Sequence, residues 1–306
     1  MKVLAIESSC DDTSIAIVND DKSVEFLETI NHRKFHKDLG GVIPEIAARQ
    51  HLEILDILGE SIKKINFSKI SAIAATFGPG LIGGLIVGSS FAKGLSISKN
   101  VKLVPINHLQ AHLLSPRLVS EIKFPYLCLL VSGGNTALVL VKNSKSFITL
   151  GSTIDDSAGE CFDKVAKGLG LGYPGGPEIE HLALGGNIEK FKLPMPLTKK
   201  NNCDFSFSGL KTAALNTIRN NKKTKLFLRD FSASFQHTVS KVLEVKIVNS
   251  FTLLQKKNIK INDFSVCGGV AANKYLNNEL QKLISKKKLN YHQVPLSLCT
   301  DNAAMI

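Results

Sequence analysis

The chain has 306 residues, enough for one large domain or two medium-sized domains with substantial cores. Its 44% hydrophobic and 21% charged residues are ordinary for a soluble globular protein, and no apolar run reaches the ~18 residues that a membrane helix needs. The net charge of +12 favours a polyanionic partner such as RNA, although base-composition bias in a genome also produces lysine-rich surfaces.

The cysteines and the amino terminus point to a reducing compartment. Six cysteines are spread singly and form no CxxC pair, which favours buried free thiols over a disulfide framework or a zinc ribbon. The amino terminus is apolar only from Val3 to Ile6, too short for a signal-peptide core, so it predicts a buried strand. We expect a cytoplasmic protein.

Two segments share one plan, an apolar strand, a polar turn and a second apolar strand. They are Val3 to Val18 and Tyr126 to Val141, and their nearly continuous Val, Ile, Leu and Ala content predicts burial on both faces. Both turns carry small hydroxyl or glycine residues whose backbone N–H groups can face an anion. This repeat, about 120 residues apart, predicts a duplicated two-lobe architecture.

Between the hairpins, strands and helices alternate. We predict strands at 70–76 and 102–106, a glycine-rich loop at 78–84, and helices at 85–97 and about 108–118. This βαβ pattern implies a right-handed crossover and a parallel portion of sheet. The remainder is mostly helical, with helices predicted at 157–168, 177–184, 210–220 and 225–255 and a strand at 264–267. The fold class is α/β, with two lobes packed around a shared cleft.

The turn of the first hairpin is acidic. Glu7, Asp11 and Asp12 place three carboxylates within six residues. Buried like charges repel each other, so this cluster needs a cation, a basic group or water. A solvated turn with an Asx cap is the alternative interpretation.

Glycine pairs stand at two further places, Gly133-Gly134 in the second hairpin turn and Gly268-Gly269 before a helix. Each pair alone is consistent with a tight turn. Together with the hairpin turns they predict loops that hold a phosphate chain and an adenosine, with the helix amino terminus favouring negative charge. The spacing does not match the P-loop motif GxxxxGK[ST], so a different kind of nucleotide site is indicated.

His108 and His112 stand at i and i+4 on a predicted helix, so both imidazoles project from one face. The HExxH motif of a metalloprotease is absent, because Gln110 cannot act as the general base. Two histidines need a third ligand, and Asp301 is the best distant candidate. Such a set with open positions suits Fe(II), and zinc is compatible; a purely structural histidine pair is the alternative.

Asp163 stands between apolar helix positions and precedes the glycine-rich loop 172–177. A carboxylate beside glycine backbone suits contacts to the two hydroxyls of a ribose. The alternative is a helix cap or an ion pair with Lys164 or Lys167.

A series of segments, in order along the chain, resembles one known family. They are ESSCDDTS, HKDLGGVIPEIAARQH, TFGPGLIGGL, NHLQAHLLSP, LLVSGGNT, IDDSAGECFDKVAKGLGLGYPGGP, DFSFSGLKTA, CGGVAANKYL and CTDNAAMI. They are similar to the Kae1/TsaD family of tRNA N6-adenosine threonylcarbamoyltransferases, in its bacterial and organellar TsaD type. The resemblance covers essentially the whole chain. It implies the actin-like ATPase fold of sugar kinases and Hsp70, with two related lobes, 1–114 and 115–306, around a nucleotide cleft.

The resemblance also implies a reaction. Threonylcarbamoyl is transferred from threonylcarbamoyl-AMP to N6 of adenosine 37, in transfer RNAs that read codons beginning with A, and AMP leaves. Asp11 falls on the family's acidic turn, where it can orient or deprotonate the incoming amine. We hypothesise that the metal binds an oxygen of the donor and neutralises developing charge.

Site residues are carried over by motif. The metal ligands, usually of iron, match His108, His112 and Asp301. The loop that contacts the phosphate or carbamoyl portion of the donor matches Leu130, Val131, Ser132, Gly133 and Gly134. The positions that hold the ribose and base of the adenylate match Asp163, Gly176, Glu180 and Asn273.

Partners follow from the resemblance as well. Bacterial relatives act on transfer RNA with a small paralogous actin-like subunit of the TsaB type and a P-loop ATPase of the TsaE type. A threonylcarbamoyl-AMP synthase supplies the donor, and no membrane is involved. An organellar member would work in the mitochondrial matrix. Relatives continue beyond Ile306 with a further helix, so we expect the carboxyl-terminal helix to be truncated here.

Two other functions stay open at this point. The first is an ATP-dependent acyl or sugar kinase of the same fold, which the histidine pair disfavours because magnesium prefers oxygen ligands. The second is a non-catalytic scaffold subunit. Such partners tend to lack the histidines and the acidic turn, both of which are present here.

Overall fold

The computed structural model describes residues 1–32, 42–63 and 65–306, so the first part of the segment HKDLGGVIPEIAARQH, residues 36–41, lies outside the described residues. The chain forms two compact units, Met1–Val119 with Thr300–Ile306, and Ser120–Cys299. The end of the chain belongs to the first unit because the short helix η3 (Ala303–Met305) is buried against β1, β2 and β3. The family lobe boundary expected at 114/115 stays a prediction.

The sheet of the first unit has five strands in the order β3-β2-β1-β4-β5. Strands β1, β2 and β3 form an antiparallel meander, whereas β1, β4 and β5 run parallel. Their bounds are β1 Lys2–Glu7, β2 Asp12–Asn19, β3 Val24–Asn31, β4 Ile70–Gly78 and β5 Lys102–Asn107. The predicted hairpin and the parallel βαβ crossover are confirmed, while β3 was not expected.

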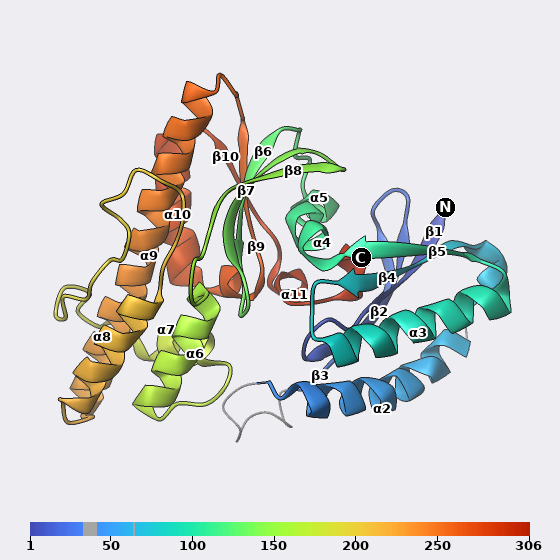
Figure 1. Cartoon of the computed structure of the whole chain (residues 1–306), viewed down its shortest axis with the longest axis horizontal. Coiled ribbons are helices and arrows are strands. Elements are labelled where there is room, and N and C mark those ends of the chain that lie inside the picture. The colour runs from blue at the N-terminus through green and yellow to red at the C-terminus, as the bar shows by residue number, and fades with distance from the viewer. Residues whose placement is uncertain (33–41, 64) are drawn as a thin grey trace. The chain divides into compact units, whose positions relative to one another are not determined.

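Helices α2 (Pro44–Lys63) and α3 (Ile82–Lys99) lie side by side on one face of this sheet (Figure 1). The apolar face of α2, with Ile54 and Leu58, packs with Leu4 and Ile73 of the sheet in one buried cluster. Burial of each such side chain contributes about 1.5–3 kcal/mol, which fixes the strand ends that carry the functional residues. The short helix η1 (Phe67–Lys69) precedes β4, and α4 (His108–Leu114) and α5 (Pro116–Val119) follow β5.

The sheet of the second unit repeats the topology of the first. Its order is β10-β9-β6-β7-β8, with β6, β7 and β8 as an antiparallel meander and β6, β9 and β10 parallel. The bounds are β6 Tyr126–Val131, β7 Thr136–Asn143, β8 Ser146–Ser152, β9 Asp263–Cys267 and β10 Asn290–Gln293. The first hairpin strand is central in both sheets, so the duplication predicted from the two hairpins is confirmed.

The second unit carries most of the helices. The four helices predicted between the second hairpin and the last strand are confirmed to within a few residues, and α9 lies beside α10 (Figure 1). The bounds are α6 Ala158–Leu169, α7 Gly175–Leu182, α8 Ser208–Arg219, α9 Lys225–Lys256, η2 Gly269–Ala272, α10 Lys274–Lys286 and α11 Leu296–Cys299. None of the helices in the described ranges combines the length and apolar character that a bilayer crossing requires.

The cysteines are free thiols, as expected. All are buried except Cys10, which is partly exposed. Cys128 on β6 and Cys267 on β9 place their sulfur atoms 3.5 Å apart without a bond.

Candidate active site

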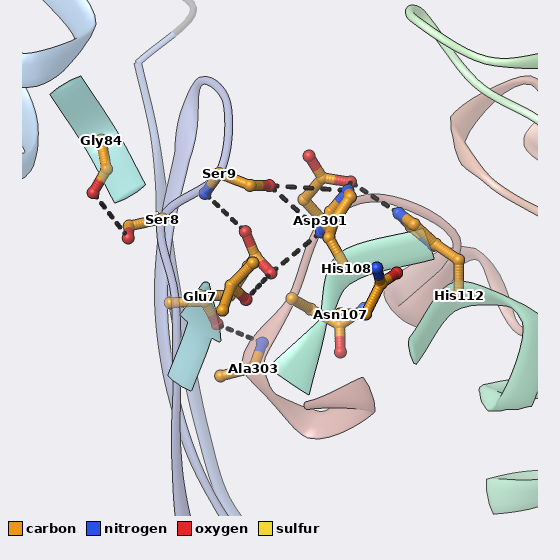
Figure 2. A network of polar contacts seen from close by, with 12 residues as sticks. Glu7, Ser8, Ser9, Gly84, Asn107, His108, His112, Asp301 and Ala303 are labelled. Atoms are coloured by element: carbon orange, nitrogen blue, oxygen red, sulfur yellow. Dashed lines mark hydrogen bonds and ion pairs between the residues drawn. The ribbon is translucent and has the colours of Figure 1, made fainter. Parts of the chain in front are cut away.

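Three of the predicted residues converge in the first unit, at the carboxyl end of β5. Strand β5 ends at Asn107 and helix α4 begins at the next residue, because the Asn107 side chain accepts a hydrogen bond from the backbone N–H of Gln110 at 3.0 Å. His108 and His112 therefore lie one turn apart at the start of a capped helix. Asp301 comes from the end of the chain, and both imidazoles point toward its carboxylate (Figure 2).

The spacing of these side chains fits one metal ion. Nε2 of His112 lies 2.9 Å from Oδ1 of Asp301, and Nε2 of His108 lies 3.6 Å from the same oxygen. A metal bound at about 2.0–2.2 Å separates neighbouring ligand atoms by roughly 3.0–3.5 Å. The Nδ1 atom of His112 is buried and has no hydrogen-bond partner among the described residues, so this ring engages the site through Nε2. The three residues are able to hold a metal.

Electrostatics favour a charged carboxylate at this point. Burial alone would raise the pKa of Asp301, but the hydrogen bond from His112 and the charges of both histidines lower that pKa below its usual value. Burial opposes a charge on His108, whereas its hydrogen bond to Glu7 and the charges of Glu7 and Asp301 raise the pKa of His108 to about 9. The two carboxylates of Glu7 and Asp301 thus stabilise positive charge on the groups that they contact, which also suits a bound cation.

The loop of the second hairpin lies in the second unit. Ser132 and Asn135 close a tight turn, with the N–H of Ser132 donating to the Asn135 carbonyl at 2.8 Å, and Gly133 and Gly134 are exposed between them. Leu130 and Val131 belong to β6 and are buried, so the exposed part of this loop is Gly133 and Gly134. Gly268 adopts φ +94°, and a Cβ atom there would lie 2.4 Å from the carbonyl oxygen of Val131. Only glycine fits this close approach of the two loops.

The residues predicted to hold the adenylate also lie in the second unit. Asp163 on α6 accepts a hydrogen bond from the Gly175 N–H at 2.7 Å. Gly176 and Glu180 stand four residues apart on α7, on one helix face. Glu180 Oε1 accepts from the Lys274 N–H at 2.6 Å, next to Asn273.

The amino terminus of α10 is capped by two side chains of the chain itself. Glu180 accepts hydrogen bonds from the N–H groups of Lys274 and Tyr275, and Asn273 Oδ1 accepts from the Leu276 N–H at 2.9 Å. These acceptors already satisfy the first N–H groups of α10, and the expectation that the helix terminus after Gly268-Gly269 favours a ligand phosphate stays a prediction. The Nδ2 atom of Asn273 is buried and lacks a hydrogen-bond partner within the described part of the chain.

Comparisons with known proteins identify the family. A family model, TsaD: tRNA N6-adenosine threonylcarbamoyltransferase, matches residues 25–306. The tRNA N6-adenosine threonylcarbamoyltransferase of Wolbachia sp. subsp. Brugia malayi (strain TRS) is 48% identical, over 99% of this chain and 90% of the relative. The chain belongs to this family. A relative of the same name from Thermosipho africanus (strain TCF52B) is 45% identical, over 100% of this chain and 92% of the relative.

Solved structures show the fold. The crystal structure of HypF from T. kodakarensis superposes with a TM-score of 0.66 at 12% identity, covering 99% of this chain and 46% of that one. The actin-like ATPase fold that the sequence implied is confirmed. Family membership makes the chain a transferase that modifies tRNA, and it disfavours the kinase and scaffold alternatives.

The acidic turn of this family member is not a solvated turn as a whole. Glu7 has no exposed surface, Ser8 and Ser9 are 1% exposed, and Asp12 is buried at the start of β2. The backbone N–H of Ser9 donates to Oε1 of Glu7 at 2.6 Å, so this N–H is already bound to a carboxylate of the chain itself, and anion binding by the turn stays a prediction. Asp11 lies half-buried on the same turn, and its catalytic role stays a prediction.

The glycine-rich loop and helix α3 pack directly on this turn. Ser8 Oγ donates to the carbonyl of Gly84 at 3.0 Å (Figure 2). The N–H of Leu81 donates to the carbonyl of Ser9 at 2.7 Å. A Cβ atom at Gly88 would lie 1.9 Å from Ser8 Oγ, so any larger residue at position 88 would displace the Ser8 side chain. The sequence predicted the loop and the helix but not this contact, which fixes the backbone before Asp11.

A chain of hydrogen bonds, in which each group donates to the next, connects helix α2 to the acidic turn. The carbonyl of Cys10 can only accept, so Nε2 of His51 carries the proton and donates to it at 3.1 Å. Nδ1 of His51 then accepts from the Thr13 hydroxyl at 2.7 Å, and Thr13 Oγ1 accepts from Nε2 of His32 at 2.9 Å. Neither histidine was singled out from the sequence, because nothing local marks these contacts.

This arrangement predicts an acid-sensitive contribution to stability. Burial lowers the pKa of His51, against the opposing effects of the Cys10 carbonyl and of the charges of Glu7 and Asp11. Below the unfolded pKa of about 6.5, the unfolded chain therefore binds more protons than the folded chain. The contribution is complete above that pH and is lost as the pH falls through the folded pKa, at up to about 1.4 kcal/mol per pH unit.

The substitution His51→Gln is expected to flatten this dependence, because glutamine keeps an N–H donor and cannot titrate. Urea unfolding between pH 7.5 and 5.5 measures the free energy of unfolding of both proteins. His181→Gln is the matched control, since His181 is exposed. Equal pH slopes for the wild type and His51→Gln would contradict the assignment.

Proposed function

We propose that this chain transfers threonylcarbamoyl from threonylcarbamoyl-AMP to N6 of adenosine 37 in transfer RNAs that read ANN codons. The N6 nitrogen bonds to the carbamoyl carbon, the bond from that carbon to the phosphate oxygen breaks, AMP leaves, and N6 loses a proton. The observation that carries the proposal is the convergence of His108, His112 and Asp301 in a chain 45–48% identical to named transferases of this kind.

The chain's own residues mainly position the reactants. The exocyclic amine of adenine is a poor nucleophile, because its lone pair is delocalised into the ring, while the mixed anhydride of the donor supplies a good leaving group. Correct placement of two reactants contributes about 7–11 kcal/mol to such a step. A general base contributes about 10²–10⁴-fold, and Asp11 is our candidate to orient the amine or accept its proton.

Fe(II) is the proposed metal, with zinc as the alternative. Two imidazoles and one carboxylate with open positions suit either ion. When bound, the metal would supply positive charge that polarises an oxygen of the donor and neutralises charge that develops there. His108, His112 and Asp301 would hold it.

The second unit supplies the proposed donor-binding residues. The exposed loop with Gly133 and Gly134 is suited to the phosphate or carbamoyl portion, through its backbone. The side chains of Asp163, Glu180 and Asn273, with Gly176, are the proposed contacts of the ribose and base. The buried and unpartnered Nδ2 of Asn273 supports this assignment, because such an amide normally has an acceptor.

Exposed lysines support transfer RNA as the acceptor. Several clusters on the second unit are exposed, and their charge favours a phosphate backbone: Lys199–Lys200, Lys222–Lys223, Lys256–Lys257 and Lys286–Lys288. We also propose a TsaB-type subunit and a TsaE-type ATPase as partners, a threonylcarbamoyl-AMP synthase upstream, and a cytoplasmic location, or the mitochondrial matrix for an organellar source.

Reconstitution tests the proposal. The protein and its partners are incubated with threonine, bicarbonate, ATP, a threonylcarbamoyl-AMP synthase and unmodified transfer RNA, and the nucleosides are analysed by mass spectrometry. Threonylcarbamoyladenosine is expected only in the complete mixture. Its absence, together with phosphorylation of a small-molecule panel by ATP, would favour the kinase alternative instead.

A further inference from the structure

We propose that Glu7 is a positioning residue for the metal centre: it fixes the tautomer and orientation of His108 so that Nε2 faces the ion. This inference rests on the proposed metal site and adds a residue that is not itself a ligand. Glu7 Oε2 lies 3.0 Å from Nδ1 of His108, whereas the other ring nitrogen, Nε2, lies 3.6 Å from Oδ1 of Asp301 (Figure 2).

Strand topology explains the contact. Glu7 ends β1, Thr76 stands near the end of β4, and His108 directly follows β5. These strands are neighbours and run parallel, so their carboxyl ends meet at one edge of the sheet. Residues about a hundred positions apart are thereby brought into direct contact, and ligands of open α/β sheets bind at this kind of edge.

The carboxylate of Glu7 is itself held in place. Ser9 donates its backbone N–H to Oε1 at 2.6 Å, and the Thr76 hydroxyl donates to Oε2. Glu7 is fully buried, and leaving a buried carboxylate without such partners costs several kcal/mol. The side chain therefore has one orientation, and the imidazole that contacts it is fixed in turn.

The tautomer of His108 follows from hydrogen-bond chemistry. An ionised carboxylate can only accept, so the proton of the Glu7–His108 hydrogen bond is on Nδ1. In the neutral imidazole that a metal would bind, Nε2 then carries the lone pair, and this nitrogen is the one near Asp301. A carboxylate behind a histidine ligand also makes that ligand more basic, and its loss typically weakens metal binding by 10–100-fold.

A purely structural role does not account for the choice of residue. An apolar side chain would fill the end of a buried strand without burying a charge, and β1 is apolar from Val3 to Ile6. The Ser9 N–H and the Thr76 hydroxyl need only an acceptor, whereas one further partner of this carboxylate gains a defined tautomer and orientation from it. His108 is that partner.

Cobalt binding by the full-length protein tests the proposal. Co(II) is titrated into metal-free protein, followed by its visible ligand-field absorption and by competition with a chelator. Glu7→Gln is expected to weaken cobalt binding by 10–100-fold and to change the absorption band, because its amide would direct a donor at Ser9 or Thr76. Glu28→Gln is the matched control: this carboxylate accepts a hydrogen bond from Ser61 and binds no histidine among the described contacts.

Each outcome has one meaning. Cobalt binding by Glu7→Gln with wild-type affinity and absorption would overturn the positioning role while leaving the metal site and the proposed function standing. A wild-type protein that binds no cobalt would overturn the metal site and this inference with it. If Glu7→Gln does not fold, Thr76→Val removes only the hydroxyl that holds Oε2, and a severalfold weaker affinity is expected. An unchanged affinity and band for Thr76→Val would then overturn the proposal.

Discussion

The double substitution of His108 and His112 by alanine is expected to abolish metal binding and to lower the transfer rate by about 10³-fold or more. A metal at a reacting centre contributes several kcal/mol, and each 1.36 kcal/mol corresponds to a factor of ten in rate. Both imidazoles present Nε2 to the carboxylate of Asp301, so their removal leaves one ligand of the set. Metal content by mass spectrometry and single-turnover formation of the modified nucleoside measure the two effects.

The control for this prediction lies on the same helix. Gln110 is exposed, between the two histidines in sequence and away from their shared face, so Gln110→Ala should retain metal and activity. Asp301→Asn provides a second test that keeps the size of the side chain and removes the charge. Full activity in a metal-free double variant would refute the metal-dependent mechanism, whereas retention of both metal and full activity in Asp301→Asn would remove Asp301 from the set of ligands.

The fold was predictable wherever burial was on both faces. The central hairpins, β1 with β2 and β6 with β7, are continuous apolar runs, and both were predicted within a residue or two. Strand β3 was missed because it is an edge strand with Glu25 and Glu28, and much of it is exposed. Helix α2 was not predicted, although the sequence indicates it: Pro44 begins the helix, and its buried residues recur at helical spacing.

The site divides in the same way. The i, i+4 spacing of His108 and His112 is local, and the family resemblance supplied Asp301, so the metal set could be predicted. The contact of Glu7 with His108 joins residues 101 positions apart and depends on the strand order, which the sequence pattern does not reveal. The hydrogen bonds of His51 to Thr13 and Cys10 are missed for the same reason, because they require helix α2 to lie on the first sheet.

Substitution of Asn273 by serine is expected to raise the KM for threonylcarbamoyl-AMP by about two- to tenfold, without loss of stability. Asn273 Oδ1 caps α10, and a serine hydroxyl makes an equally good cap. Serine lacks the second function of asparagine, the buried Nδ2 donor that has no partner in the described chain. A hydrogen bond from this amide to the neutral ribose or base is worth about 0.5–1.5 kcal/mol, which corresponds to about two- to tenfold in affinity.

Comparison of Asn273→Ser with Asn273→Ala separates the capping of α10 from the ligand contact. Alanine removes both functions, so it should lower the free energy of unfolding by about 0.5–2 kcal/mol and also raise the KM. Thermal unfolding and steady-state kinetics on the two variants distinguish the effects, and a wild-type KM for Asn273→Ser would reduce Asn273 to a cap. Because Glu180 already accepts from the first N–H groups of α10, the helix terminus has few donors left for an anion. Recognition of the adenylate at this helix would therefore depend on side-chain donors, with Nδ2 of Asn273 as the first of them.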